Sequence, residues 1–148
     1  MQKTIIAGLL ILLTASVSSQ VLAQEEIIEK RQKAMKSNSA DVKAIKAAVE
    51  SKDYATIETK AKDIMGTADK IPSLFPKGSD KGKTKATAAI WEKSDEFAKE
   101  AKNLSKASSE LASAAKSKDD AAIAAKVKAV GEACSSCHKE FRADKYSE

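Results

Sequence analysis

Both prolines of this 148-residue chain fall in one internal stretch, and no other feature limits its fold so strongly. Pro72 and Pro76 lie within residues 71–84, together with Gly78 and Gly82. Because proline lacks a backbone N–H and glycine favours turns, this stretch is predicted to be the one long loop. The segments on either side of it are predicted to be helical.

Apolar residues recur in these segments at steps of three, four or seven, which places them on one face of a helix. We expect helices over residues 25–50, 54–71, 86–116 and 120–146. Four such helices can bury one shared core. Their apolar seams are Ile28, Met35, Val42, Ile45 and Val49; Ile57, Ala61, Ile64, Ala68 and Ile71; Ile90, Phe97, Leu104 and Leu111; and Ile123, Val127, Val130, Cys134, Cys137 and Phe141.

Two short connections have the same sequence, Ser-Lys-Asp, at residues 51–53 and 117–119. Aspartate before a helix can cap the free backbone N–H groups of its first turn. Connections this short join antiparallel neighbours, so the chain is predicted to form two helical hairpins joined by the Pro/Gly loop. The predicted fold is all-α, an antiparallel up-down-up-down four-helix bundle.

The run Cys134-Ser135-Ser136-Cys137-His138 is a C-x-x-C-H motif, which is typical of covalent haem attachment. Thiols three residues apart on a helix share a face, and each can form a thioether with a haem vinyl group. The histidine that follows can supply a neutral imidazole to the iron. A thioredoxin-like site would need a βαβ unit, a zinc site usually needs four Cys or His ligands, and a disulfide leaves the histidine unexplained. The motif therefore predicts one covalently bound haem c.

The N-terminus has the pattern of a secretory signal peptide. Lys3 precedes an apolar run over residues 5–13, and Val21-Leu22-Ala23 is a small-residue cleavage site. The apolar run is shorter than the roughly 20 residues that span a bilayer. We expect residues 1–23 to be removed after Ala23, leaving a mature domain over residues 24–148. Because covalent haem is attached outside the cytoplasm, the predicted location is the periplasm.

The chain has a formal charge of +5, of which Lys3 contributes one. Basic and acidic side chains are interspersed along the predicted helices, and no cluster of basic and aromatic residues suggests nucleic-acid binding. Stable membrane insertion of the mature domain is not expected. A mild positive potential can steer an acidic redox partner protein.

His138 is the only histidine, so the sixth position of the iron is left to methionine, lysine, water, another ligand or none. In the predicted topology the first helix begins beside the end of the last. Met35 would lie ~15 Å from that end and His138 ~12 Å, on facing helices. Met65 has a similar depth but lies beside the stripe of its helix, so Met35 is better aimed. Met35 either ligates the iron or contacts the haem.

Two arginines are candidates to bind a haem propionate, since guanidinium pairs well with carboxylate. Arg31 lies one turn before Met35 and, like Asn38, occupies an inward position where an apolar residue is expected. Its alternative is a flank residue that reaches solvent. Arg142 follows His138 by four residues on the same predicted helix face, and it would meet a propionate, shield the proximal side or simply be solvated.

These residues together resemble the class II c-type cytochromes, that is, cytochrome c′ and its low-spin relatives. The resemblance covers the whole mature chain. Residues 31–35 resemble the first-helix segment of the family, residues 74–91 its middle loop and residues 134–142 its haem-binding end. It implies that Cys134 and Cys137 hold one haem, that His138 is an axial iron ligand, that Arg31 and Gln32 line the pocket, that Lys85 lies near the haem edge, and that Met35 is the distal residue.

The family divides at the distal position. In cytochrome c′ proper the residue packs over an open iron face, whereas in the low-spin relatives a methionine ligates the iron. The hypothesis that we favour is a periplasmic electron carrier with Met35 as the possible sixth ligand. The alternative is a five-coordinate cytochrome c′ that binds nitric oxide or carbon monoxide. An enzyme such as a peroxidase would need a distal acid–base group, and the chain has no second histidine. The resemblance also makes a homodimer possible.

Overall fold

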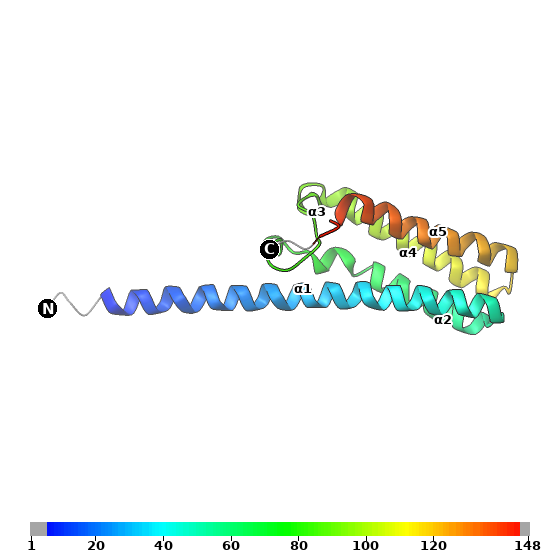
Figure 1. Ribbon diagram of the computed structural model, residues 1–148, viewed down its shortest axis with the longest axis horizontal. Coiled ribbons are helices and arrows are strands. Elements are labelled where there is room, and N and C mark those ends of the chain that lie inside the picture. Colours follow the sequence, from blue (N-terminus) through cyan, green and yellow to red (C-terminus); the bar gives the residue numbers. More distant parts are fainter. Residues whose placement is uncertain (1–5, 146–148) are drawn as a thin grey trace.

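The computed structural model describes the backbone of residues 6–145 and the side chains of residues 21–145. Four long helices form an antiparallel up-down-up-down bundle, in which α2 packs against α1 and α4, and α4 packs against α5 (Figure 1). The predicted all-α fold is thus confirmed. The elements are α1 (Ile6–Ser51), α2 (Tyr54–Ala68), the 3-10 helix η1 (Ile71–Leu74), α3 (Ala89–Glu92), α4 (Ser94–Lys116) and α5 (Asp120–Phe141).

The predicted apolar seams meet in one core. Its most deeply buried large side chains come from all four long helices and include Ile45, Ile57, Leu111 and Ile123. Alanine is prominent among the buried residues of α2 and α4, and such small side chains let helices approach closely. The buried alanines of these two helices are Ala61, Ala68, Ala101, Ala107, Ala112, Ala114 and Ala115.

The two Ser-Lys-Asp connections are tight turns of the same design. Lys52 and Lys118 both adopt a left-handed backbone, with φ of 55° in each case. The carboxylates of the next residues then cap α2 and α5, because Asp53 accepts from the Thr56 N–H and Asp119 from the Ala122 N–H, each over 3.0 Å. The predicted capping role of the two aspartates is therefore confirmed.

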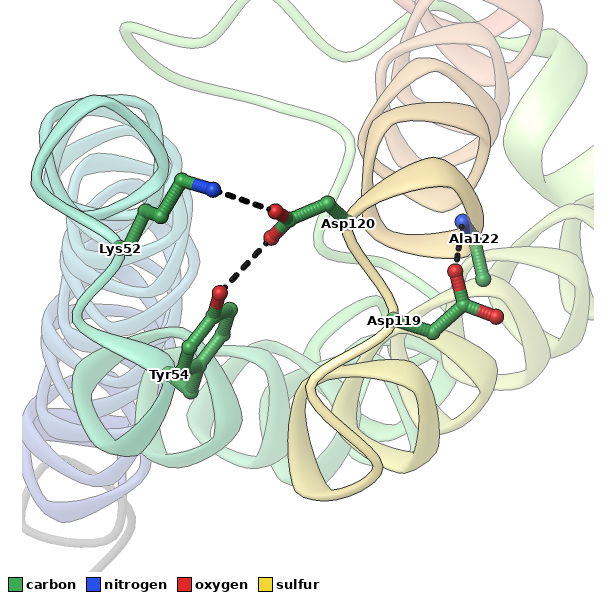
Figure 2. Close-up of polar contacts among 5 residues, drawn as sticks. All are labelled: Lys52, Tyr54, Asp119, Asp120 and Ala122. Atoms are coloured by element: carbon green, nitrogen blue, oxygen red, sulfur yellow. Dashed lines mark hydrogen bonds and ion pairs between the residues drawn. The ribbon is translucent and has the colours of Figure 1, made fainter.

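One residue joins the two hairpins at this end of the bundle. Asp120 accepts hydrogen bonds from Lys52 Nζ at 2.7 Å and from the Tyr54 hydroxyl at 2.9 Å (Figure 2). Both contacts hold the pKa of Asp120 below its ordinary value, with the Lys52 bond the larger cause. These exposed contacts fix the relative position of the hairpins rather than a reactive site.

The first helix is longer than predicted. α1 begins at Ile6 instead of residue 25, and its early turns extend past the rest of the bundle (Figure 1). Val21 and Leu22 are 50% and 66% exposed, so the end of the predicted signal peptide lies outside the core. Cleavage after Ala23 stays a prediction, and residues 1–5 lie outside the described part of the chain. No helix within that part combines the length and apolar character needed to cross a bilayer.

Three predicted helix limits are wrong. The second helix ends at Ala68, because η1 takes over before Pro72. The third does not begin at residue 86: α3 comes first, and the chain breaks at Lys93, with φ −122° and ψ 49°, before α4. The last helix ends at Phe141 rather than at residue 146, which itself lies outside the described range.

Long-range backbone pairing explains the early end of α5. Arg142 is extended, with φ −127° and ψ 122°, and forms an antiparallel bridge with Ala86. The Thr87 N–H donates to the Phe141 carbonyl at 3.2 Å, and the Ala143 N–H donates to the Lys85 carbonyl at 2.8 Å. These bonds replace the next helical turn, so they also keep residues 85–88 out of a helix.

Candidate functional site

The last turns of α5 present the C-x-x-C-H motif. Cys134 and Cys137 are half-buried and pack against the core, whereas His138 is exposed. The two thiols are free and are not joined in a disulfide. The helix therefore places two sulfur atoms on its inner side and an imidazole next to them, as the motif predicted.

The electrostatics of the three groups keep both sulfurs protonated and leave the imidazole neutral. Burial raises the pKa of Cys134, and burial followed by the negative charge of Glu100 raises the pKa of Cys137 to about 11. Desolvation lowers the pKa of His138, and the charge of Arg142 lowers it further. At neutral pH the sulfurs are thus thiols, and the imidazole keeps a free nitrogen lone pair that a metal can bind.

The helix on the other side of the seam from α5 is α1. Among the four long helices, α1 and α5 contact each other far less than the pairs α1 and α2, α2 and α4, or α4 and α5 do, so the seam between α1 and α5 is the least packed of the bundle. Met35 on α1 and both cysteines on α5 are half-buried and pack against the core. Met65 does not belong to this set. Met35 is thus the methionine that packs against the core, as its place on the apolar stripe of its helix indicated.

Arg31 is buried, with only 3% of its surface exposed, so the alternative of a flank residue reaching solvent is wrong. Its Nη2 donates to the Ser79 carbonyl at 2.7 Å, and its Nη1 donates to the Ser79 hydroxyl at 3.3 Å. The guanidinium lies 4.8 Å from the ring centre of Phe75 and 5.9 Å from that of Trp91. Arg31 thus fastens the Pro/Gly loop to α1, while its buried Nε has no partner among the described residues.

The other predicted pocket residues lie around the same loop. Gln32 donates to the Lys83 carbonyl at 3.1 Å, and Lys85 Nζ donates to the Asp144 carbonyl at 2.6 Å. Arg142 is exposed and lies beyond the end of α5, so the prediction that it shares a helix face with His138 is wrong. Its backbone N–H instead caps the helix on the His138 carbonyl at 3.2 Å.

Sequence reasoning missed the residues that hold this end of the bundle together. The Phe97 ring lies 4.9 Å from Phe75 and 5.2 Å from Phe141, so one aromatic stack joins the loop, α4 and the end of α5. Ser79, the acceptor for Arg31, had no signal in the sequence, because its role comes from a contact 48 residues away. The periodicity of Phe97 and Phe141 did mark those two rings as inward-facing.

These residues fit a haem. The thiols and the imidazole come from α5 and the thioether of Met35 from α1, and two buried polar atoms about one turn from Met35 lack partners within the described structure. These atoms are Arg31 Nε, a donor suited to a propionate, and Oδ1 of Asn38, which is 6% exposed. Buried polar groups without partners are costly, so their presence indicates a ligand or water at this place.

Comparisons with known proteins agree with this chemistry. The family model described as Cytochrome C′ matches residues 26–142. A cytochrome c′ of Rhodospirillum rubrum is 35% identical over 97% of this chain and 100% of its own length, and a cytochrome c-556 of Rhodopseudomonas palustris is 31% identical over 96% and 97%.

Solved structures give the same result. A cytochrome c′ from Thermochromatium tepidum is 29% identical, with a TM-score of 0.76, and the match covers 82% of this chain and 97% of that one. A second cytochrome c′, described as having an unusual ligand-controlled dimer dissociation, is 29% identical over the same shares, with a TM-score of 0.77.

Proposed function

The chain belongs to the cytochrome c′ family, and from this premise we propose that it is an exported electron carrier with one covalent haem c. The observation that carries the proposal is that Met35 on α1 and Cys134 and Cys137 on α5 are all half-buried against the same core. When bound, the haem iron supplies a one-electron couple. The residues of the chain provide its attachment and its ligation.

Each residue has a defined role in this proposal. The thiols of Cys134 and Cys137 add across the two vinyl groups, with each S–H hydrogen going to the neighbouring carbon. His138 offers a ring nitrogen as the axial ligand, and its low pKa keeps that nitrogen deprotonated. Arg31 keeps its Nε for a propionate while its other nitrogens hold Ser79. Gln32 and Lys85 order the loop beside the haem edge through their backbone acceptors.

Met35 decides what kind of carrier this is. A thioether ligand raises the reduction potential relative to a histidine ligand, and it saturates the iron so that little rearranges on electron transfer. Methionine is flexible, so a side chain that packs against the core can also reach a metal in the same seam. The likeness to both a cytochrome c′ and a cytochrome c-556 leaves this position to experiment.

A five-coordinate form that binds nitric oxide or carbon monoxide is the second candidate. It is favoured by the relative whose dimer dissociation is ligand-controlled, since that relative takes up an added ligand. In this case Met35 would crowd an open iron face instead of occupying it. A homodimer of this chain belongs to the same candidate.

Absorption spectra of the ferric and ferrous protein, with and without carbon monoxide, separate the two candidates. Electron transfer with Met35 ligation predicts a low-spin ferrous spectrum that carbon monoxide does not change. Met35→Ala should then become high-spin and bind carbon monoxide, whereas Met65→Ala, the matched control on α2, should keep the parent spectrum. A high-spin parent that takes up carbon monoxide would support the second candidate.

Export is tested on protein purified from a native host with haem maturation intact. Mass spectrometry of the purified chain should give a polypeptide that starts at Gln24 and carries one haem. Recovery of the uncleaved chain from the periplasmic fraction, or of a bare polypeptide mass, would contradict the proposed processing.

A further inference from the structure

The positive charge of this chain is concentrated in two segments. Residues 77–85 and 138–145 together hold seven basic and three acidic side chains, a net of +4. The remaining residues after Ala23 hold 18 basic and 18 acidic side chains and are therefore neutral overall. We call the surface formed by these two segments the basic end.

Tertiary structure brings the two segments together. The Ala86–Arg142 bridge, the Ala143-to-Lys85 backbone bond and the Lys85-to-Asp144 bond join them side by side at one end of the bundle (Figure 1). All but one of their basic side chains are exposed. The exposed ones are Lys77, Lys81, Lys83, Lys139, Arg142 and Lys145.

The carboxylates of the basic end are already counted in its net charge of +4. Glu140 pairs with Lys93, which lies outside the two segments, at 2.6 Å, and Asp80 pairs with Lys81 inside them at 2.9 Å. The nearest turns of α1, residues 24–33, carry three acidic and three basic side chains. Residues 92–100, on α3 and α4, hold four acidic and two basic side chains, and Lys93 among them pairs with Glu140, so an acidic stretch lies directly beside the basic end.

The basic end also borders the proposed haem site. The loop contacts α1 through the Arg31–Ser79 and Gln32–Lys83 hydrogen bonds, and it contacts the end of α5 through Arg142. It therefore bridges α1, which carries Met35, and α5, which carries the C-x-x-C-H motif. We propose that the basic end is the docking surface for an acidic protein, the electron-transfer partner. This inference rests on the proposed function and adds the chemistry of the partner.

A protein is the partner that fits best, because the surface carries positive charge on the basic end and negative charge on the adjoining residues 92–100. This arrangement can orient a partner as well as attract it, and such complementarity mainly raises the association rate. A uniform anionic membrane would instead be repelled by the acidic flank. Steering of this kind raises on-rates by ~10-fold or more at low salt and fades within a Debye length of ~8 Å at physiological salt.

Two triple variants with equal charge change test the proposal. Lys77→Gln/Lys139→Gln/Lys145→Gln removes three charges from the basic end without touching the proposed haem ligands. Lys46→Gln/Lys116→Gln/Lys118→Gln removes three from the hairpin end, about 33 Å away along the 22 residues of α5. Haem content and the circular dichroism of both variants are measured first, so that a loss of structure is recognised.

The first readout is the rate of oxidation of the ferrous protein by the anion hexacyanoferrate(III), measured at 10 mM and 200 mM ionic strength. At 10 mM we expect a loss of at least about fivefold for the basic-end variant and less than about twofold for the control. At 200 mM the difference should largely disappear. Equal losses in the two variants would overturn the proposal, because the charges would then act only through the net charge.

The second readout is binding of a fluorescent poly-L-glutamate and of phosphatidylglycerol vesicles, which needs no redox activity. We expect the basic-end variant alone to lose poly-L-glutamate affinity. Binding to vesicles but not to poly-L-glutamate would mean a membrane surface and would overturn the protein assignment. Because this readout does not depend on the iron, failure of the electron-carrier function, seen as carbon monoxide uptake, is distinguished from failure of the docking surface.

Discussion

The repeated Ser-Lys-Asp turns allow a matched test of backbone strain. Lys118 has φ of 55°, a conformation that costs a residue with a Cβ ~1–2 kcal/mol relative to glycine. Glycine in turn loses more conformational entropy on folding, ~0.5–1 kcal/mol. Lys118→Gly should therefore stabilise the fold by about 1 kcal/mol. The turn itself would be unchanged, because the Lys118 and Asp119 N–H groups still bond to the Ala115 and Ala114 carbonyls.

The assay is equilibrium unfolding of the haem-loaded protein in guanidinium chloride, followed by circular dichroism, with thermal unfolding as a second probe. A gain of 1 kcal/mol corresponds to a rise in Tm of about 4 °C for a domain of this size. Lys118→Ala is the control for the lost side chain, since alanine keeps the Cβ and with it the strain. If Lys118→Ala stabilises the protein as much as Lys118→Gly does, the backbone argument is refuted.

The equivalent substitution at the first turn, Lys52→Gly, should give a smaller gain in stability. Lys52 has the same φ but also donates to Asp120, so Lys52→Gly relieves the strain and removes a contact between the hairpins. We expect a smaller gain than for Lys118→Gly, or none. A larger gain at this position would mean that the Lys52–Asp120 pair opposes folding.

Three further perturbations test other parts of the structure. Ser108→Ala should stabilise the protein by ~1 kcal/mol in the same unfolding assay, because Ser108 is 0% exposed and its hydroxyl has no hydrogen-bond partner among the described residues; a loss of stability would reveal a hidden partner. Arg31→Lys should destabilise the protein by about 2 kcal/mol, because lysine cannot make both bonds to Ser79. The same variant should be cut faster by trypsin in the Pro/Gly loop. The control Ser79→Ala keeps the carbonyl acceptor and should be cut nearly as slowly as the parent. The pKa of Asp120 is depressed, first by Lys52, so its contribution to stability is present above the ordinary pKa of ~3.9 and is lost as pH falls through the lower folded value. Asp120→Asn should therefore lower the stability at pH 7 and flatten this part of the acid-unfolding curve. An unchanged curve would contradict the assignment.

Some residues carry enough local information to be placed correctly from the sequence. The seams of Ile57, Ile64 and Ile123 depend only on helical periodicity, and the caps at Asp53 and Asp119 depend on contacts three residues away. The C-x-x-C-H motif belongs to the same class, because its thiols and imidazole lie within five residues on one helix.

The errors share a cause, which is contact across long separations in the sequence. Nothing near Arg142 stops a helix; its pairing with Ala86 does, since the loop backbone offers bonds that compete with another helical turn. By its sequence position Arg31 suits solvent as well as a propionate, yet Ser79 buries it. The basic end could not be predicted from the sequence because its two segments, residues 77–85 and 138–145, are far apart in the chain and are joined only by the Ala86–Arg142 bridge and the bonds of Lys85.

From its sequence alone, this chain is fixed as a bundle of helices with a motif for covalent haem, because helix periodicity, turns and thiol spacing are set by neighbours within a few residues. Only the folded molecule decides which helices leave an open seam, where α5 stops, how the Pro/Gly loop is fastened and where positive charge collects. These outcomes depend on pairings 48 to 59 residues apart, as for Arg31 with Ser79 and Lys85 with Asp144, whose energies no local pattern contains.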